Sequence, residues 1–109
     1  MKSNEFMFIK SEFKIIKANY EDILFLEGLK DYTKIYIKGK PKPVLTLQSL
    51  KYYEAKLESE MFIRVHKSFI ISVRHIDVIS KNIVNIGEYA IPVSESYRKV
   101  ILQLVQENS

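Results

Sequence analysis

Apolar and polar residues alternate along several short stretches of the chain. In residues 32–38 (YTKIYIK), Ile35 and Ile37 fall on one side, and the lysines fall on the other. A period of two residues is that of a β-strand with one buried face and one face in water. Two further stretches are also β-prone: residues 6–17, which fit one or two strands, and residues 23–26 (ILFL), whose continuous apolar run is typical of a buried strand.

A longer β-prone run, residues 62–77 (FIRVHKSFIISVRHID), carries basic residues along its length and no acid before its last position. Its apolar alternation breaks at Lys67 and Ser68 and then resumes. Unpaired charge is costly to bury, so these basic groups must reach water or an anionic partner. Three more short strands are expected in HIDVIS, NIVNI and YAIPV, with two-residue turns at Lys81–Asn82 and Gly87–Glu88.

Two stretches change to helical spacing. The first, residues 47–58, has Thr46 as its expected N-cap and places on one face Leu47, Leu50, Tyr53 and Leu57. The second follows an expected cap at Ser94 and places on one face Tyr97, Ile101, Leu104 and Val105. Strands and helices do not alternate, so a parallel nucleotide-binding sheet is not expected. We therefore predict a mostly β fold of several small antiparallel sheets, with one short internal helix and a C-terminal helix.

The size and composition of the chain suit a small cytoplasmic protein. Its 109 residues are expected to form one domain, spanning residues 1–109. The absence of cysteine excludes disulfides and thiolate metal sites and fits a reducing compartment. The N-terminal segment lacks the apolar core of a signal peptide, and no apolar run approaches the roughly 20 residues of a spanning helix. We expect a soluble, cytoplasmic protein without a membrane partner.

Positive charge is concentrated in three segments. The net charge is +4, yet residues 30–42 alone contain five lysines against one aspartate. Residues 64–75 contain three basic side chains and no acid, and Arg98 and Lys99 add two more. The rest of the chain is therefore acidic. A positive face on an acidic body suits a polyanionic partner, whereas the plainer interpretation is that the lysines are simply solvated.

No pattern in the chain favours catalysis or a bound cofactor. There is no glycine-rich phosphate loop, no cysteine nucleophile and no nucleophile-elbow context around Ser68, Ser94 or Ser96. His66 and His75 have no third ligand at a suitable spacing, so a metal site is not expected. We predict that the protein is not an enzyme and needs no cofactor.

Binding is the chemistry that remains. His66, Lys67 and Ser68 place ring donors, a cation and a hydroxyl within three residues, and such groups bind phosphate oxygens and reach base edges. The alternative is a satisfied core histidine beside a turn cation. The lack of nearby acids and the second basic run at residues 30–42 favour the binding interpretation.

Three motifs occur in order along the chain. SLKYYEAKLES is followed by FIRVHKSF (Phe62 to Phe69) and, far downstream, by PVSESYR (Pro92 to Arg98). Together they closely resemble the LytTR-type DNA-binding domain of bacterial response regulators. That family typically shows a Leu-rich helix, then Phe-x-Arg-x-His-x-Ser-Phe, then Pro-Val and Ser-x-x-Tyr-Arg. The segment ILFLEGLKDYTKIYI is similar to the family's early strand–turn–strand unit, so the resemblance covers about residues 7–105.

The resemblance implies several antiparallel sheets with small helices, and loops rather than a recognition helix that enter the DNA grooves. It implies sequence-specific binding of double-stranded promoter DNA as a homodimer, in the service of transcription regulation within a two-component system. Such regulators usually carry a receiver or membrane domain ahead of the DNA binder. We therefore expect this chain to be either a domain cut from a longer regulator, whose receiver domain is missing, or a stand-alone protein.

Three loop regions carry the family's DNA contacts, and the resemblance maps them onto Tyr32, Thr33 and Lys34, then His66, Lys67 and Ser68, then Ser94, Ser96, Arg98 and Lys99. The sequence departs from the family at Glu95, where many members carry Arg. Glu95 has two available roles, as an acceptor for a cytosine amino group or as a first-turn acid favoured by the helix dipole. Near phosphates it would repel.

Two other functions stay open on the sequence. One is a single-stranded nucleic-acid module that uses Tyr32, Tyr36 and Phe62 as stacking platforms, although the chain has no RNP-like signature. The other is a protein-interaction module whose basic face meets an acidic partner. Preference for duplex over single strands would favour the DNA-binding hypothesis, and indifference to nucleic acid would favour the protein-interaction hypothesis.

Overall fold

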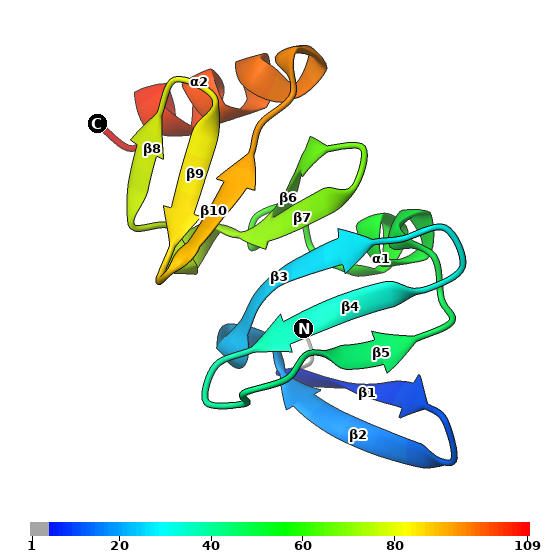
Figure 1. The fold of residues 1–109 in the computed structure, drawn as a ribbon. Helices are drawn as coiled ribbons and strands as arrows, with labels where there is room; N and C mark the ends of the chain where they lie inside the picture. Colours follow the sequence, from blue (N-terminus) through cyan, green and yellow to red (C-terminus); the bar gives the residue numbers. More distant parts are fainter. Residues whose placement is uncertain (1–4) are drawn as a thin grey trace.

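The computed structural model describes residues 5–109, and within them ten strands form three separate antiparallel sheets (Figure 1). The first four residues of the expected domain lie outside this described part. The two-stranded sheet pairs β1 (Phe6–Ser11) with β2 (Lys14–Asn19). The central sheet has the order β5 (Val44–Thr46), β4 (Thr33–Ile37), β3 (Ile23–Gly28), β7 (Phe69–Ser72) and β6 (Phe62–His66). The third has the order β10 (Tyr89–Pro92), β9 (Ile83–Ile86) and β8 (Val78–Ser80).

Two α-helices complete the fold, α1 (Leu50–Lys56) and α2 (Arg98–Glu107), with three 3₁₀ turns, η1 (Tyr20–Asp22), η2 (Val73–His75) and η3 (Glu95–Tyr97). The prediction of small antiparallel sheets with an internal and a C-terminal helix is confirmed. The stretch at residues 6–17 supplies parts of two strands, and the two expected two-residue turns connect β8 with β9 and β9 with β10. None of the helices of residues 5–109 is long and apolar enough to cross a membrane.

The central sheet is buried on both faces, which explains the continuous apolar run in β3. Leu26 belongs to a core cluster that α1 and the β1–β2 hairpin cover, whereas Phe25 belongs to a second cluster that the β8–β10 sheet and α2 cover. The same division occurs in β6, where Phe62 joins the first cluster and Val65 the second. Because side chains of a strand alternate between its faces, a strand between two cores must be apolar at consecutive positions.

Helix α1 begins later than the sequence pattern predicted. Its N-cap is Ser49, whose Oγ accepts a hydrogen bond of 3.0 Å from the Tyr52 backbone N–H. The prediction of Thr46 as N-cap was wrong, because Thr46 is a buried residue of β5 that pairs with Thr33 of β4. Leu47 consequently lies in the loop ahead of the helix and is 86% exposed, instead of packing on the helical face.

The C-terminal helix is preceded by the η3 turn. Ser94 precedes η3 as predicted, but its side chain makes no capping hydrogen bond. Ile101 is buried against the β8–β10 sheet, as the helical spacing predicted, whereas Val105 is exposed. The expected apolar face is therefore narrower than the sequence suggested, because the small third sheet covers only part of the helix.

Candidate nucleic-acid interface

The three predicted contact regions meet at one edge of the molecule, where the β3–β4 turn, the β6–β7 turn and the start of η3 lie (Figure 1). Two backbone hydrogen bonds join them. The Gly28 N–H donates to the Ser68 carbonyl at 2.8 Å, and the Ser94 N–H donates to the Val65 carbonyl at 3.0 Å. The β6–β7 hairpin therefore lies between the other two regions and fixes both of them.

The β6–β7 turn presents Lys67 at its tip, where the side chain is exposed. The Ser68 backbone N–H donates to Nδ1 of His66 at 3.0 Å, and the His66 ring packs edge-on against Phe69 with 5.6 Å between ring centroids. Because Nδ1 accepts a hydrogen bond, the neutral ring carries its proton on Nε2. His66 thus stabilises the turn through its Nδ1, and its Nε2 remains a hydrogen-bond donor.

Arg64 holds this turn by hydrogen bonds to its backbone, a role that the sequence pattern does not indicate. Its Nε donates to the His66 carbonyl at 2.9 Å and its Nη2 to the Lys67 carbonyl at 2.5 Å. Its Nη1 lies 2.7 Å from Oε1 of Glu54 on α1, and its side chain is only 15% exposed. The planar guanidinium suits this task because its several N–H donors point in fixed directions. Arg64 is thus a positioning residue for Lys67.

In the β3–β4 region, the structure separates the three predicted contacts. Tyr32 and Lys34 are half-buried, but Thr33 is fully buried and its hydroxyl donates to the Gln48 carbonyl at 2.7 Å. Thr33 therefore lies too deep to touch a ligand and instead ties β4 to the segment before α1. The Leu29 N–H donates to the Tyr32 carbonyl at 2.8 Å, which closes the turn and leaves Lys30 exposed at its tip.

Further along β4, the Tyr36 hydroxyl donates to Oε1 of Glu27 at 3.3 Å. Burial, and then the charge and hydrogen bond of Glu27, raise the pKa of Tyr36. Tyr36 also stacks on Phe25, with 4.2 Å between ring centroids. These contacts pack the Tyr36 ring against the second core cluster, so it is not an exposed platform for a base.

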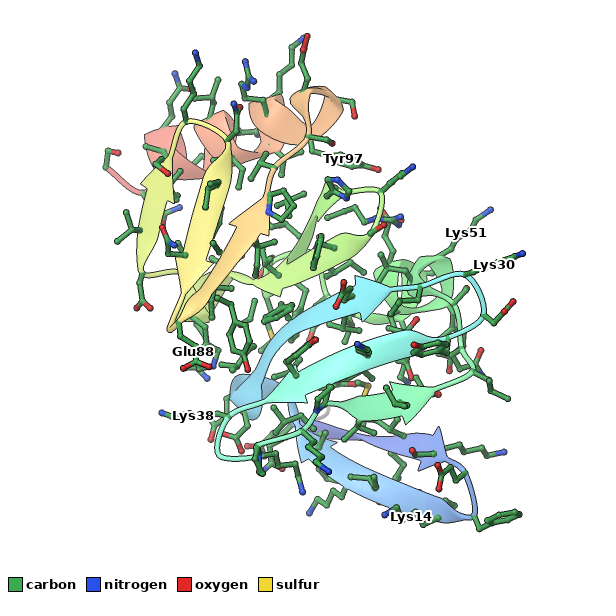
Figure 2. All side chains as sticks on the ribbon, viewed as in Figure 1. Lys14, Lys30, Lys38, Lys51, Glu88 and Tyr97 are labelled. Carbon is green, nitrogen blue, oxygen red and sulfur yellow. The ribbon has the colours of Figure 1, made fainter. Side chains whose placement is uncertain are left out.

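A shallow hollow of about 360 Å³ joins the first two regions. Its walls come from the β3–β4 turn, the first turn of α1 and the β6–β7 turn, including Lys30, Tyr32, Ser49 and Lys67. Lys51 belongs to the first turn of α1, which forms one wall of this hollow, and it is labelled at the same edge as Lys30 (Figure 2). Lys30 belongs to the basic run of residues 30–42, but Lys51 could not be predicted here, since nothing in the sequence pattern indicates that α1 begins beside the β3–β4 turn.

The third region lies on the far side of the β6–β7 hairpin, with Tyr97 at the same edge (Figure 2). Ser94 and Ser96 approach each other with 3.4 Å between their hydroxyl oxygens. Nη2 of Arg98 donates to Oδ1 of Asn82 at 2.7 Å, and its Nε is buried without a hydrogen-bond partner among the described residues. Arg98 therefore braces the β8–β9 turn, while Lys99 is exposed.

The structure divides the basic segment of residues 30–42 between two places. Lys30 lies at the edge with the loops, whereas Lys38 lies at the opposite end of the central sheet (Figure 2). Lys40 and Lys42 follow in the β4–β5 connection. Arg74 also contributes little net charge, since its Nη1 lies 3.3 Å from Oε2 of Glu21. The expected single positive face is therefore replaced by a smaller group of lysines at the edge.

Among residues 5–109, no three His, Asp or Glu side chains group as a metal site requires.

Comparisons with known proteins agree with this architecture. The family model described as the LytTr DNA-binding domain matches residues 13–106. The sensory transduction proteins LytT of Bacillus cereus and Bacillus anthracis are each 33% identical over 101 residues, which cover 87% of this chain. The chain spans only 40% of the length of these two relatives. A solved LytTr DNA-binding domain from Bacillus cereus superimposes with a TM-score of 0.81 at 24% identity, covering 94% of this chain and 98% of the other.

Proposed function

Since this chain belongs to the LytTr DNA-binding domain family, we propose that it binds double-stranded DNA at specific sequences and so regulates transcription. The observation that carries the proposal is the convergence of three loop regions on one edge, with Lys67 at their centre. Loops that project from a rigid scaffold can follow the curved surface of a duplex. No helix of the described residues projects from this edge in the manner of a recognition helix.

Lys67 is the side chain best placed to read a base. A lysine ammonium donates hydrogen bonds to the O6 and N7 acceptors of guanine in the major groove, or to a phosphate oxygen. Arg64 donates to the backbone carbonyls of His66 and Lys67, so the turn is already ordered before DNA binds. An ordered turn loses less conformational entropy on binding, which favours affinity.

The exposed lysines around Lys67 supply the contacts to the backbone of the duplex. Lys30 and Lys51 lie on one side of it, and Lys99 follows η3 on the other. Each phosphate that such a lysine neutralises releases condensed counterions, so binding should weaken as salt increases. Glu95 is exposed among these groups, and it favours sites where no phosphate approaches η3.

The chain acts as the output domain of a cytoplasmic two-component regulator. The two relatives are named sensory transduction proteins, and this chain matches 40% of their length, which supports an output role for the matching part. Two copies bind promoter repeats as a homodimer on DNA. Repeats spaced by about 10 bp place both copies on the same side of the duplex.

Selection of bound sequences from a random duplex pool tests the proposal. The selection is performed at about 0.15 M salt, where nonspecific charge binding is partly suppressed. We expect an enriched motif, in the form of two short elements about one helical turn apart. Retention that depends on salt without any enriched motif would contradict sequence reading, and stronger retention of single strands would favour the stacking alternative.

A further inference from the structure

The tip of the β1–β2 hairpin exposes side chains that do not pack against the rest of the fold. Phe13 is fully exposed there, beside exposed Lys14, and Glu12 adopts a left-handed backbone conformation with φ of 54°. A non-glycine residue in this conformation is strained, so the tight turn is maintained at some cost. An aromatic ring held wholly in water gives up the stabilisation that burial would provide. The tip is therefore a candidate for contact with another molecule.

The hairpin tip lies at the same edge of the molecule as the β3–β4 turn and the loop before α1 (Figure 1). A hollow of about 670 Å³ connects these segments, and its walls include Lys10, Glu12, Tyr32 and Leu47. Leu47 is itself 86% exposed, so apolar surface continues from the loop before α1 toward the tip. The hairpin thus extends the row of loops that forms the candidate interface.

We propose that the β1–β2 tip is a further DNA contact, which lies against the duplex beside the sequence that the three loops read. The inference rests on the proposed function and deepens it by adding a fourth contact. Lys10 and Lys14 bind phosphate oxygens, and Phe13 packs on the sugars or the edge of a base step in the minor groove. Apolar side chains with neighbouring cations are a recurring means of binding that groove.

The size of the molecule permits such a contact. Its longest dimension is 42 Å, and one turn of duplex DNA is about 34 Å. A molecule of this size can therefore contact about one turn of the duplex. The acids of the hollow restrict how the contact forms, because Glu12 and Asp31 both line it. The DNA phosphates therefore reach Lys10 and Lys14 from outside the hollow, and the DNA backbone does not enter it.

A protein partner is the competing occupant of the hairpin. The outer face of the hairpin holds Phe8 and Ile15, each 63% exposed, and Lys17 lies 4.4 Å from the centroid of the Phe6 ring. That face points away from the core, and nothing else in the structure indicates what covers it. The tip is different, because it is continuous with the loops already assigned to DNA. Continuity therefore favours DNA at the tip.

The test compares Lys10→Gln/Lys14→Gln with a control of equal charge, Lys38→Gln/Lys40→Gln, whose lysines belong to the opposite end of β4. Binding is measured on a duplex of about 40 bp centred on the selected site and on one trimmed to about 20 bp, that is, about two helical turns. On the long duplex, we expect the tip variant to lose about three- to tenfold in affinity, and its salt slope to fall by about 1–2 as one or two phosphate contacts disappear. The control should bind like the wild type on both duplexes.

Phe13→Ser gives a second measurement that does not depend on charge. Its ring is fully exposed, so the variant should fold normally, and circular dichroism checks this. We expect hydroxyl-radical footprinting to show lost protection in the flanking minor groove and unchanged protection at the selected site.

Equal affinity and equal footprints for the tip variants would overturn the inference and leave the hairpin to a protein partner, provided that Lys67→Ala still weakens binding. A loss of affinity that is the same on both duplexes would also overturn it, since the contact would then lie within the core site. If no variant, including Lys67→Ala, changes binding, the proposed function itself fails.

Discussion

Lys67 and Arg64 lie three positions apart on the β6–β7 hairpin, and their surroundings differ completely. Lys67 projects into solvent from the tip of the turn. Arg64 is largely buried, and its guanidinium donates hydrogen bonds to two backbone carbonyls and to Glu54. In the sequence, the two cations are equivalent members of one basic run. Their division into a proposed contact residue and a positioning residue depends on which way each side chain leaves the strand, and on a bulge between Arg64 and His66.

For Lys67→Ala, we expect a loss of affinity of about 1–3 kcal/mol that is concentrated on the selected site, because a side chain that reads a base discriminates between sequences. Fluorescence anisotropy on the selected duplex and on a scrambled duplex measures the difference. A uniform loss on both duplexes would show that Lys67 contacts only phosphate. Unchanged affinity on both would remove Lys67 from the interface.

For Arg64→Lys, we expect weaker binding to the selected site with little change in the salt slope. The single ammonium of lysine cannot donate in the fixed directions that reach both carbonyls and Glu54, so the turn loosens while the net charge stays the same. Arg74→Lys is the matched control, since within residues 5–109 Arg74 pairs with exposed Glu21 and lies outside the turn. Hydrogen exchange at the Ser68 amide should accelerate in Arg64→Lys alone. Equal exchange in both variants would contradict the positioning role.

At the scale of elements, the sequence predicted the strands well and the helix starts less well. Two-residue periodicity and turn residues are local signals, so β4 and the turns of the third sheet could be predicted directly. The start of α1 could not, because Thr46 and Ser49 are both acceptable caps and only the pairing of β5 with β4 decides between them. The burial of Thr33 follows from the same pairing, which explains why a position assigned to DNA by resemblance lies in the core.

Gly28→Ala tests how tightly these elements are joined. A Cβ at Gly28 would lie 3.0 Å from Cβ of Leu50 in α1, which is closer than ordinary packing allows. We expect the free energy of unfolding to fall by about 1–3 kcal/mol, because overpacking of a core usually destabilises a protein by this amount. Urea denaturation monitored by circular dichroism measures the change. An unchanged midpoint would show that α1 shifts away from β3 without cost.

At the scale of the whole molecule, the distribution of charge was the hardest property to predict. The lysines of residues 30–42 are close in the sequence, but β4 carries Lys30 and Lys38 to opposite ends of the sheet. Lys51 enters the interface from another part of the chain, through the packing of α1. The candidate interface is therefore assembled by contacts between segments that are distant in the sequence. Runs of basic residues in the sequence indicate that a positive surface exists, but they do not indicate which residues form it.

Glu95→Arg tests the outline of the interface at that scale. Glu95 is exposed in η3, at the edge where the loops converge, and Glu88 is exposed in the β9–β10 turn, away from that edge (Figure 2). Both substitutions raise the net charge by two, so Glu88→Arg is a matched control for long-range attraction. We expect Glu95→Arg to tighten binding to scrambled duplex and to steepen its salt slope by about 1, because the new guanidinium gains a phosphate contact. Titrations of both variants between about 0.05 and 0.2 M salt measure the slopes. Equal slopes would mean that Glu95 lies off the bound DNA, and the third region would then contact the duplex only through residues beyond η3.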